Sequence, residues 1–349
     1  MKNRKILSAH LIGLIVSLLF LSGCDNQKVK LTSLKVEMQE NPIGIGTPNP
    51  RFSWQITSVK PDLQQKSYQI QVALSEENLK NEENLIWDSG IIEDDKSVLI
   101  PFKGEELKSG LKYYWRLRVS TNQGDTDWSK INTWSMALLN ESDWKAKWIG
   151  EDSMSNPGET DKGNTRLAAR YLRKPFTLKN NIERAVLYIS GQGVYEAYIN
   201  GEKISEDVLS PTVSWYPDRV YYNVYDVTPL LKRNDNILGV ILGNGRYFGM
   251  REGWNQLFGL PRLLAQLEVE YSDGSTDTII SDETWRVTSK GPIVANNEFD
   301  GEEYDARLEI VNWNLANFND SGWKNADIME APGGIITAQP NPNIRVQDE

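Results

Sequence analysis

Residues 185–211 read AVLYISGQGVYEAYINGEKISEDVLSP, and residues 221–249 read YYNVYDVTPLLKRNDNILGVILGNGRYFG. Short apolar runs rich in β-branched and aromatic residues are interrupted by polar, turn-forming pairs. Along one run the apolar positions alternate with their neighbours, at Tyr195, Ala197 and Ile199. This period of two is typical of a strand with one buried face. The dipeptide Asn200-Gly201 follows directly and predicts a type I′ turn, because both central residues of that turn need positive φ. The stretch therefore predicts an antiparallel β-module that contains an Asn-Gly hairpin.

The amino-acid sequence of this region resembles the N-terminal β-sandwich module of bacterial α-L-rhamnosidases. These are the inverting glycoside hydrolases that remove terminal L-rhamnose. The resemblance rests on four segments in order: SGQGVYEAYINGEKISEDVLSP (190–211), YNVYDVTPLL (222–231), ILGNGRYFG (241–249) and DGEEYDARLE (300–309). It implies a jelly-roll sandwich of the galactose-binding type. It also implies that the catalytic helical barrel of the family follows such a module, beyond residue 349. On this basis we expect a non-catalytic N-terminal portion that is inactive by itself.

The chain has 349 residues and a net charge of −10. Its length suggests about two domains of roughly 150 residues each. The 26 glycines, 12 tryptophans and 14 tyrosines fit a turn-rich β-protein. An acidic chain argues against a nucleic-acid partner and against binding to anionic lipid, since both need clustered Lys and Arg.

Residues 1–24 are predicted to be an export leader. Three basic residues precede an apolar core over residues 6–21, and Leu-Ser-Gly-Cys ends at Cys24. This ending resembles a bacterial lipoprotein signal, which implies that Cys24 is lipidated and anchors the protein in the cell envelope, in the periplasm or at the cell surface. The alternatives are an ordinary secretory leader and a single membrane anchor. Cys24 is the only cysteine, so no intrachain disulfide can form.

The rest of the chain is predicted to be all-β. Residues 25–30 are polar and indicate a tether. Residues 31–140 contain short alternating strands with frequent turn signals, typical of an immunoglobulin or fibronectin-III-like sandwich. Residues 141–332 are predicted to form the jelly-roll module. Residues 331–349 contain three prolines and a Gly-Gly pair, so residues 333–349 are predicted to be a linker or the start of a further domain.

Several kinds of catalytic centre are excluded by composition. The only histidine, His10, lies in the predicted leader, so a mature chain has no Ser-His-Asp or Cys-His arrangement and no His/Cys metal site. Glycosidase chemistry needs only two carboxylates. An acidic segment offers candidates at Glu298, Asp300, Glu302, Glu303 and Asp305. The alternative is an acidic loop that bonds its own backbone or Arg307. The family resemblance places this segment in the non-catalytic sandwich, so we predict no catalytic residues here.

A calcium site is the other chemical hypothesis, since Ca²⁺ takes oxygen ligands from carboxylates, amides and carbonyls. Carbohydrate-binding relatives of this module grip rhamnose with a bound Ca²⁺ and an adjacent Asp-Asn pair, which the resemblance would place at Tyr195-Glu196. That pair is replaced here. The remaining candidate metal ligands are Glu196 and Asn244.

Aromatic residues outside the alternating strands are a second indication of carbohydrate binding. Exposed rings stack on the apolar face of a sugar, and nearby polar groups bind its hydroxyls. The candidate carbohydrate-binding residues are Glu196, Trp215, Tyr216, Asn244, Arg246, Tyr247 and Trp254, with Phe248, Arg251 and Asn255 beside them. The alternative is that these residues pack under loops or against a further domain.

Three functions remain open. The first is the front portion of an α-L-rhamnosidase that acts on rhamnosylated glycans, with a catalytic domain as its partner. The second is a stand-alone carbohydrate-binding surface lipoprotein. The third is an inert truncated fragment.

Overall fold

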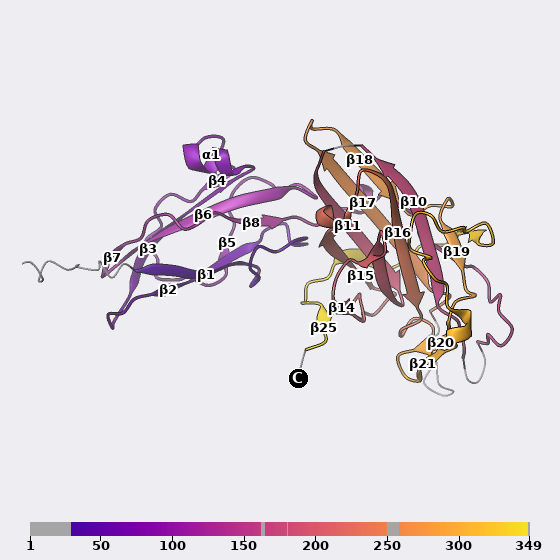
Figure 1. Cartoon of the computed structure of the whole chain (residues 1–349). Helices are drawn as coiled ribbons and strands as arrows, with labels where there is room; N and C mark the ends of the chain where they lie inside the picture. Colours follow the sequence, from indigo (N-terminus) through magenta and orange to yellow (C-terminus); the bar gives the residue numbers. More distant parts are fainter. Residues whose placement is uncertain (1–28, 162–164, 180, 250–257, 348–349) are drawn as a thin grey trace, which may run out of the picture. The chain divides into compact units, whose positions relative to one another are not determined.

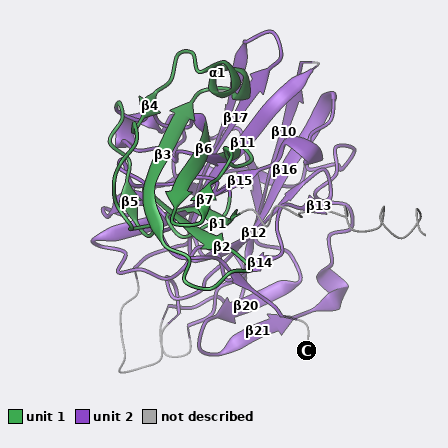
Figure 2. Cartoon of the chain, turned by 90° about the vertical axis from the view of Figure 1, so that its left-hand side faces the viewer, with its two compact units in different colours: residues 1–40, 51–105, 114–132 green, residues 41–50, 106–113, 133–349 purple. Residues whose placement is uncertain are grey.

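The computed structural model describes residues 29–161, 165–179, 181–249 and 258–347 (Figure 1). The predicted leader, with Cys24, and most of the predicted tether lie outside these residues. The chain divides into two compact units, coloured separately in Figure 2. The first comprises residues 1–40, 51–105 and 114–132, and the second comprises residues 41–50, 106–113 and 133–349. Within the described ranges, no helix has the length and apolarity to cross a membrane.

The strands between residues 30 and 135 form a sandwich of short antiparallel strands. One sheet has the order β1-β2-β5, and the other has the order β4-β3-β6-β7 with β8 paired to β6. The strands are β1 (Lys30–Val36), β2 (Arg51–Thr57), β3 (Gln65–Ala73), β4 (Trp87–Asp88), β5 (Ile100–Pro101), β6 (Lys112–Thr121), β7 (Gly124–Asp125) and β8 (Asn132–Ser135). The short helix α1 (Glu76–Asn81) follows β3 and begins at Ser75, whose hydroxyl accepts a hydrogen bond from the backbone of Asn78. The predicted immunoglobulin-like sandwich is confirmed.

Aromatic side chains fill the core of this sandwich. The ring centroids of Phe52 and Trp115 lie 4.8 Å apart, and those of Trp54 and Tyr68 lie 5.1 Å apart. The indole nitrogen of Trp54 donates to the side-chain oxygen of Gln65 at 2.8 Å, which satisfies a buried donor. The predicted inward face of β6 is buried throughout, at Tyr113, Trp115, Leu117 and Val119.

The second unit is a larger jelly-roll sandwich. One sheet has the order β13-β12-β16-β10-β19-β22, and the other has the order β23-β9-β17-β11-β15-β24 with β18 on β17. The first sheet contains β10 (Arg170–Leu178), β12 (Val194–Ile199), β13 (Glu202–Lys203), β16 (Asn234–Gly243), β19 (Arg286–Thr288) and β22 (Lys324–Asn325). The second contains β9 (Ile149–Gly150), β11 (Ile182–Gln192), β15 (Arg219–Asp226), β17 (Arg262–Tyr271), β18 (Thr276–Ile280), β23 (Asp327–Ile328) and β24 (Ile335–Ala338).

Two further strand pairs and three short 3-10 turns complete the second unit. The pairs are β14 (Asp207–Val208) with β25 (Ile344–Arg345) and β20 (Ile293–Asn297) with β21 (Gly301–Tyr304). The turns are η2 (Glu141–Asp143), η3 (Thr228–Leu230) and η4 (Ala306–Leu308). η3 follows Asp226, whose carboxylate accepts a hydrogen bond from the backbone of Thr228 at 3.0 Å.

The main core lies between the two large sheets. Leu187 and Ile189 of β11 face Leu238 and Val240 of β16 in one buried cluster. The alternate residues of β11 are buried too, because Tyr188 packs with Tyr222 and Trp144 on the other face of its sheet. β11 is therefore buried on both faces.

The Asn-Gly hairpin is confirmed. Asn200 and Gly201 have φ of 53° and 91°, and Ile199 pairs with Glu202 across the turn from β12 to β13. Positive φ at both positions is what a type I′ turn requires.

The C-terminal segment differs from the predicted linker. β24 pairs in parallel with β15, from Arg219 opposite Ile335 to Tyr222 opposite Ala338. β25 pairs with β14. Residues 335–345 therefore belong to the second sandwich, and the Gly-Pro content of this region marks the turns that bring the strands back to it.

Candidate functional site

The predicted aromatic residues Tyr216 and Tyr247, which the structure describes, pack together with Phe258 in the second unit. The ring of Tyr216 lies 5.1 Å from Tyr247 and 5.1 Å from Phe258, and Tyr247 stacks on Phe258 at 5.7 Å. Tyr216, Tyr247 and Phe248 are buried. Burial raises the pKa of Tyr216 to about 12, so its hydroxyl stays neutral at physiological pH. These rings pack on one another and do not present a face to solvent.

Trp215 is the exception in this group. Its side chain is 53% exposed, and it meets Phe258 edge-on with ring centroids 5.8 Å apart. Trp215 lies in the turn before β15, where the backbone nitrogens of Asp218 and Arg219 donate to its carbonyl oxygen at 3.0 and 2.9 Å. An exposed indole on an ordered turn offers a surface on which a sugar ring or another protein could pack.

Asn244 is buried directly after β16 and bonds the surrounding backbone. Its side-chain nitrogen donates to the carbonyl oxygens of Leu167 at 2.6 Å and Asn296 at 2.7 Å. Its side-chain oxygen has no hydrogen-bond partner. Asn244 therefore joins three segments of chain, and a single free amide oxygen is far fewer ligands than Ca²⁺ requires.

Glu196 projects from β12 and is engaged on its own sheet. Its carboxylate accepts hydrogen bonds from Lys203 at 2.8 Å and from the Tyr198 hydroxyl at 2.7 Å. Partial burial opposes ionisation, but these hydrogen bonds outweigh it and hold the pKa of Glu196 below its ordinary value. In the part of the chain that the structure describes, no group of three or more acidic, His or Cys side chains could hold a metal ion.

Arg246 forms an ion pair with Glu298. Its guanidinium donates to both carboxylate oxygens, at 2.6 and 2.8 Å, and lies 5.6 Å from the centre of the Phe299 ring. Both side chains of the pair are partly exposed. This pair ties the loop after β16 to the turn between β20 and β21.

The acidic segment does not gather into a catalytic pair. Arg307 binds Asp305 through both ends of its guanidinium, Arg166 does the same for Glu303, and Asn297 donates to Asp300 at 3.0 Å. The hydrogen bonds from Arg307 lower the pKa of Asp305, and those from Arg166 lower the pKa of Glu303. A general acid needs a raised pKa. Wherever a carboxyl shift is resolved in the described chain, its direction is downward.

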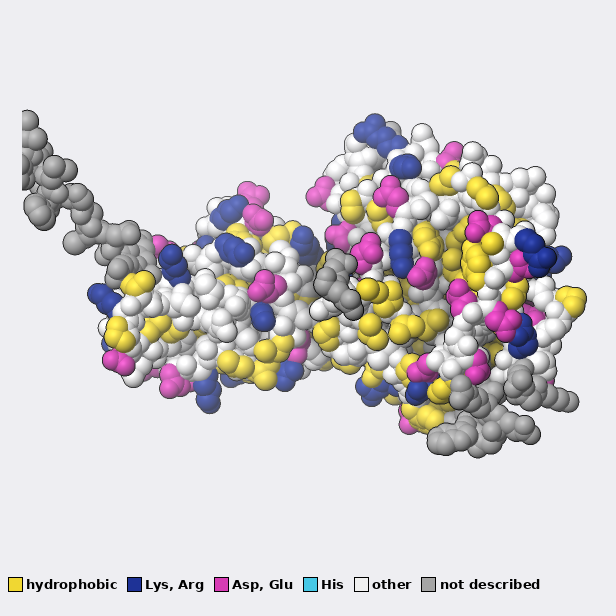
Figure 3. All heavy atoms as spheres, turned by 60° about the horizontal axis from the view of Figure 1, so that its bottom comes forward, with side chains coloured by type: hydrophobic (Ala, Val, Ile, Leu, Met, Phe, Trp, Pro, Cys, Tyr) yellow, Lys and Arg dark blue, Asp and Glu magenta, His cyan; other side chains and the backbone are white. Residues whose placement is uncertain are grey.

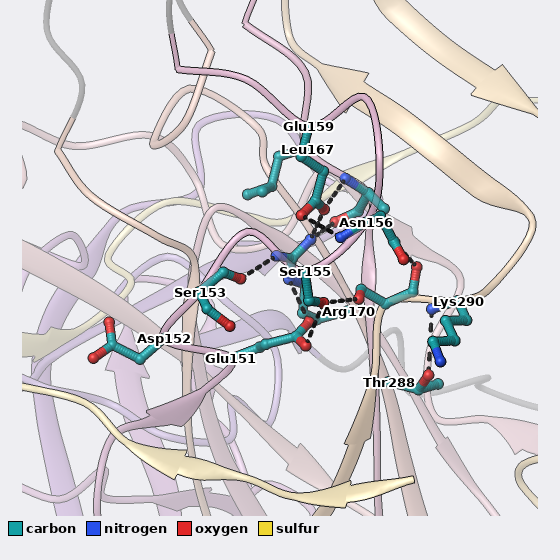
Figure 4. A network of polar contacts seen from close by, with 12 residues as sticks. Glu151, Asp152, Ser153, Ser155, Asn156, Glu159, Leu167, Arg170, Thr288 and Lys290 are labelled. Carbon is teal, nitrogen blue, oxygen red and sulfur yellow. Dashed lines mark hydrogen bonds and ion pairs between the residues drawn. The ribbon is translucent and has the colours of Figure 1, made fainter. Parts of the chain in front are cut away.

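A network of deeply buried charges in the described residues belongs to none of the predicted sites. Figure 4 shows Arg170, at the start of β10, between Glu151 and Glu159. Its guanidinium lies 3.2 Å from one Glu151 oxygen and 2.7 Å from one Glu159 oxygen, and all three side chains are at most 4% exposed. Arg170 also donates to the carbonyl oxygens of Ala168 and Ser153.

This network holds the loop between β9 and β10. The Ser155 hydroxyl donates to Glu151 at 2.8 Å, and Asn156 donates to the carbonyl oxygen of Ser289 at 2.6 Å. Lys324 lies 3.4 Å from Glu151 and supplies a second positive charge. In the sequence, the only indication of this network is an arginine at the start of an apolar strand. That arginine alone does not show which carboxylates pair with it.

Trp254, Arg251 and Asn255 of the predicted sugar-binding set lie outside the described residues, as does the predicted lipidation site Cys24.

The fold defines a class of all-β proteins with two consecutive β-sandwiches, the first immunoglobulin-like and the second a jelly roll. The model of a Rha78A-like N-terminal immunoglobulin domain matches residues 31–140. The model of the alpha-L-rhamnosidase N-terminal domain matches residues 180–348.

Whole sequences and solved structures agree with these matches. An alpha-L-rhamnosidase of Formosa agariphila is 38% identical over 311 residues, which cover 86% of this chain and 33% of that protein. Another, of Alteromonas sp., is 35% identical and covers 96% of this chain and 37% of that protein. The structure of alpha-L-rhamnosidase from Dictyoglumus thermophilum superposes with a TM-score of 0.84 at 38% identity, over 90% of this chain and 36% of that one.

The chain belongs to the α-L-rhamnosidase family. It corresponds to the two N-terminal domains of that family. It spans about a third of the length of the curated relatives that it matches.

Proposed function

We propose that this chain is the non-catalytic N-terminal portion of an α-L-rhamnosidase that acts on rhamnosylated glycans, and that it supports a catalytic domain. The observation that carries the proposal is the state of the acidic segment. Glu298, Glu303 and Asp305 are paired with arginine, and Asp300 accepts a hydrogen bond from Asn297. The resolved pKa shifts, at Glu303 and Asp305, run opposite to those of a general acid. The interior of each sandwich is filled by its own apolar side chains.

A hydrolase assay tests this proposal. The purified chain, residues 25–349, is incubated with an aryl α-L-rhamnoside, and release of the aryl group is followed by absorbance. We expect release no faster than in buffer. Release above that level, abolished in Glu302→Gln or Glu303→Gln, would assign catalysis to the acidic segment and overturn the proposal.

Rhamnose binding by the isolated chain is a second candidate, favoured by the exposure of Trp215. A stacked sugar at this indole would be oriented by polar groups of the neighbouring loops. Calorimetric titration with L-rhamnose, with and without Ca²⁺, tests it. Saturable heat that is lost in Trp215→Ala but kept in Tyr304→Ala would support binding at this indole, since both aromatic side chains are 53% exposed. Binding that needs Ca²⁺ and is lost in Glu196→Ala or Asn244→Ala would support the metal-assisted form. No heat under either condition would leave the scaffold function alone.

The cell-envelope location is also a proposal, and it rests on the leader ending at Cys24. Metabolic labelling with an alkyne fatty acid in a bacterial host should mark the full chain and spare the variant Cys24→Ala. Equal labelling of both would contradict lipidation.

A further inference from the structure

The C-terminal segment shows polar residues directed inward and apolar residues exposed. Asn223 of β15 donates to Gln339 at 3.1 Å and to Asn343 at 2.9 Å, and Gln339 donates to Asn343 at 2.8 Å. The buried hydroxyl of Tyr195 donates to Asn223 at 2.8 Å. Asn and Gln side chains of a surface segment are therefore used to hold that segment in place.

An ion pair extends this network to β14. Arg345 donates to the buried carboxylate of Asp207 at 2.7 Å, and Asn343 bonds the other oxygen of the same group. Thr212 donates its backbone N–H to Gln339 at 2.8 Å. Residues 207–219 and 335–346 thus run side by side and are fixed to each other by side-chain hydrogen bonds.

Apolar side chains from both segments are exposed beside this network. We call them the apolar strip: Leu209, Val213, Trp215, Ile335, Ile344 and Val346. Ile335 is 72% exposed and Val346 is 79% exposed. The apolar strip adjoins paired segments of the backbone. Ile344 of β25 pairs with Val208 of β14, and the backbone N–H of Ile335 donates to the carbonyl oxygen of Asp218. Figure 3 shows hydrophobic side chains gathering on the face of the second unit where Figure 1 places β14 and β25.

An ordered surface with polar side chains turned in and large apolar ones turned out is unusual for a face that meets only water. We propose that the apolar strip is the docking surface for the polypeptide that follows these two N-terminal domains in a full-length α-L-rhamnosidase. This inference rests on the proposed function, because it names the surface through which the two domains would support a catalytic domain.

Two observations favour this occupant over a second copy of the chain. This chain covers 33–38% of three matched relatives and 47% of a fourth, so more than half of each relative lies outside the matched region. Moreover, β25 lies within the strip, so a polypeptide continuing from it starts beside the surface. A short connection gives a high effective concentration, on the order of millimolar, which favours intramolecular docking.

The experiment compares the isolated chain with a chimera in which residues 29–349 replace the matched region of the Formosa agariphila enzyme. Hydroxyl-radical footprinting followed by mass spectrometry measures oxidation of Trp215, with Met38 and Tyr304 as exposed references. We expect Trp215 to be oxidised readily in the isolated chain and at least several-fold more slowly in the chimera, with both references unchanged. A chimera that hydrolyses an aryl rhamnoside while Trp215 stays reactive would overturn the docking surface and leave the proposed function intact. A folded chimera without activity in which Trp215 is protected would support the surface and count against the proposed function.

The isolated chain gives an independent test that needs no chimera. Light scattering should find a monomer, and Trp215 should be reactive at every concentration. A dimer that dissociates in Val346→Asp but not in the matched control Val59→Asp would overturn the inference in favour of self-association. Protection of Trp215 by added L-rhamnose would overturn it in favour of a sugar site. Protection in the isolated monomer without ligand would overturn it outright.

Discussion

At the scale of single residues, the second sandwich depends on charges that are buried with their partners. Arg170 is paired with Glu151 and Glu159 inside the protein, with Lys324 as a second positive charge. Arg307, by contrast, binds Asp305 at the surface with an 88% exposed side chain. The energies of the buried and the exposed ion pairs differ because a buried charge without a partner keeps its full desolvation cost, while a surface charge is solvated and screened.

The first prediction follows from this difference. Arg170→Leu leaves two buried carboxylates without their main partner and should lower the free energy of unfolding by about 3–5 kcal/mol. The matched control Arg307→Leu should lower it by less than about 1 kcal/mol. Urea unfolding followed by tryptophan fluorescence measures both. Equal losses would show that the buried network is not a major source of stability.

The second prediction concerns pH. Burial opposes the charge on Asp207, but hydrogen bonds from Arg345, Ser205 and Asn343 outweigh it and lower its pKa. A carboxyl with a lowered folded-state pKa stabilises the fold above its unfolded pKa of about 3.9, and this contribution disappears as the pH falls through the folded value. Stability should therefore decline below about pH 4, and Asp207→Asn should show a shallower decline. Urea midpoints between pH 3 and pH 7 measure this, and parallel curves for the two proteins would contradict it.

At the scale of elements, the strands that alternate in sequence were the easiest to predict. The alternation at Tyr195, Ala197 and Ile199 predicted β12 because only one of its faces is buried. The neighbouring β11 is buried on both faces, which alternation cannot reveal. The partners that cover its second face, Trp144 and Tyr222, are distant in sequence. Similarly, the sequence around Gly239 of β16 gives no reason for a glycine at that position. In the structure, a Cβ there would lie 2.8 Å from the Trp313 ring.

The third prediction belongs to the hairpin between β12 and β13. Gly201 has φ of 91°, and a Cβ added to it would lie 2.7 Å from a methyl group of Leu315. Gly201→Ala should destabilise the second sandwich by at least about 1 kcal/mol, because it adds both strain and a steric conflict. Gly322→Ala is the control, since its φ is not positive and nothing lies within 4 Å of the added atom. Thermal unfolding distinguishes them, and similar midpoints would contradict the assigned cause.

At the scale of the whole chain, each unit keeps its own hydrophobic core, and the last strands complete the second unit. β24 extends the β15 edge of its sheet, and the hydrogen bonds of Gln339 and Asn343 fix that addition. The candidate sugar-binding residues are mostly structural in this setting: Tyr216 and Tyr247 pack inside, Asn244 joins loops, and Glu196 is paired with Lys203.

The fourth prediction tests the place of the C-terminal segment. Truncation after Pro332 removes β24 and β25, leaves Asp207 buried without Arg345 and exposes the edge of β15. The second sandwich should lose several kcal/mol of stability, since a buried charge loses its partner. Truncation after Gln347 is the control and should change little. Calorimetric unfolding of the three chains measures the loss, and an unchanged transition after the longer truncation would show that the segment is a linker after all.

The sequence by itself determined the all-β class, the order of the two sandwiches, the Asn-Gly hairpin and the family. Strand alternation, turn-forming residues and family sequence motifs are local properties of the chain, so they can be identified without the fold. Only the tertiary structure decided which aromatic rings are buried, which carboxylates are paired, and that residues 335–345 return to the second sheet. These outcomes depend on contacts such as Arg170 with Glu151 and Asn343 with Asp207, between residues far apart in the chain. No local pattern encodes such a contact, since its energy depends on the burial and geometry that the folded chain creates.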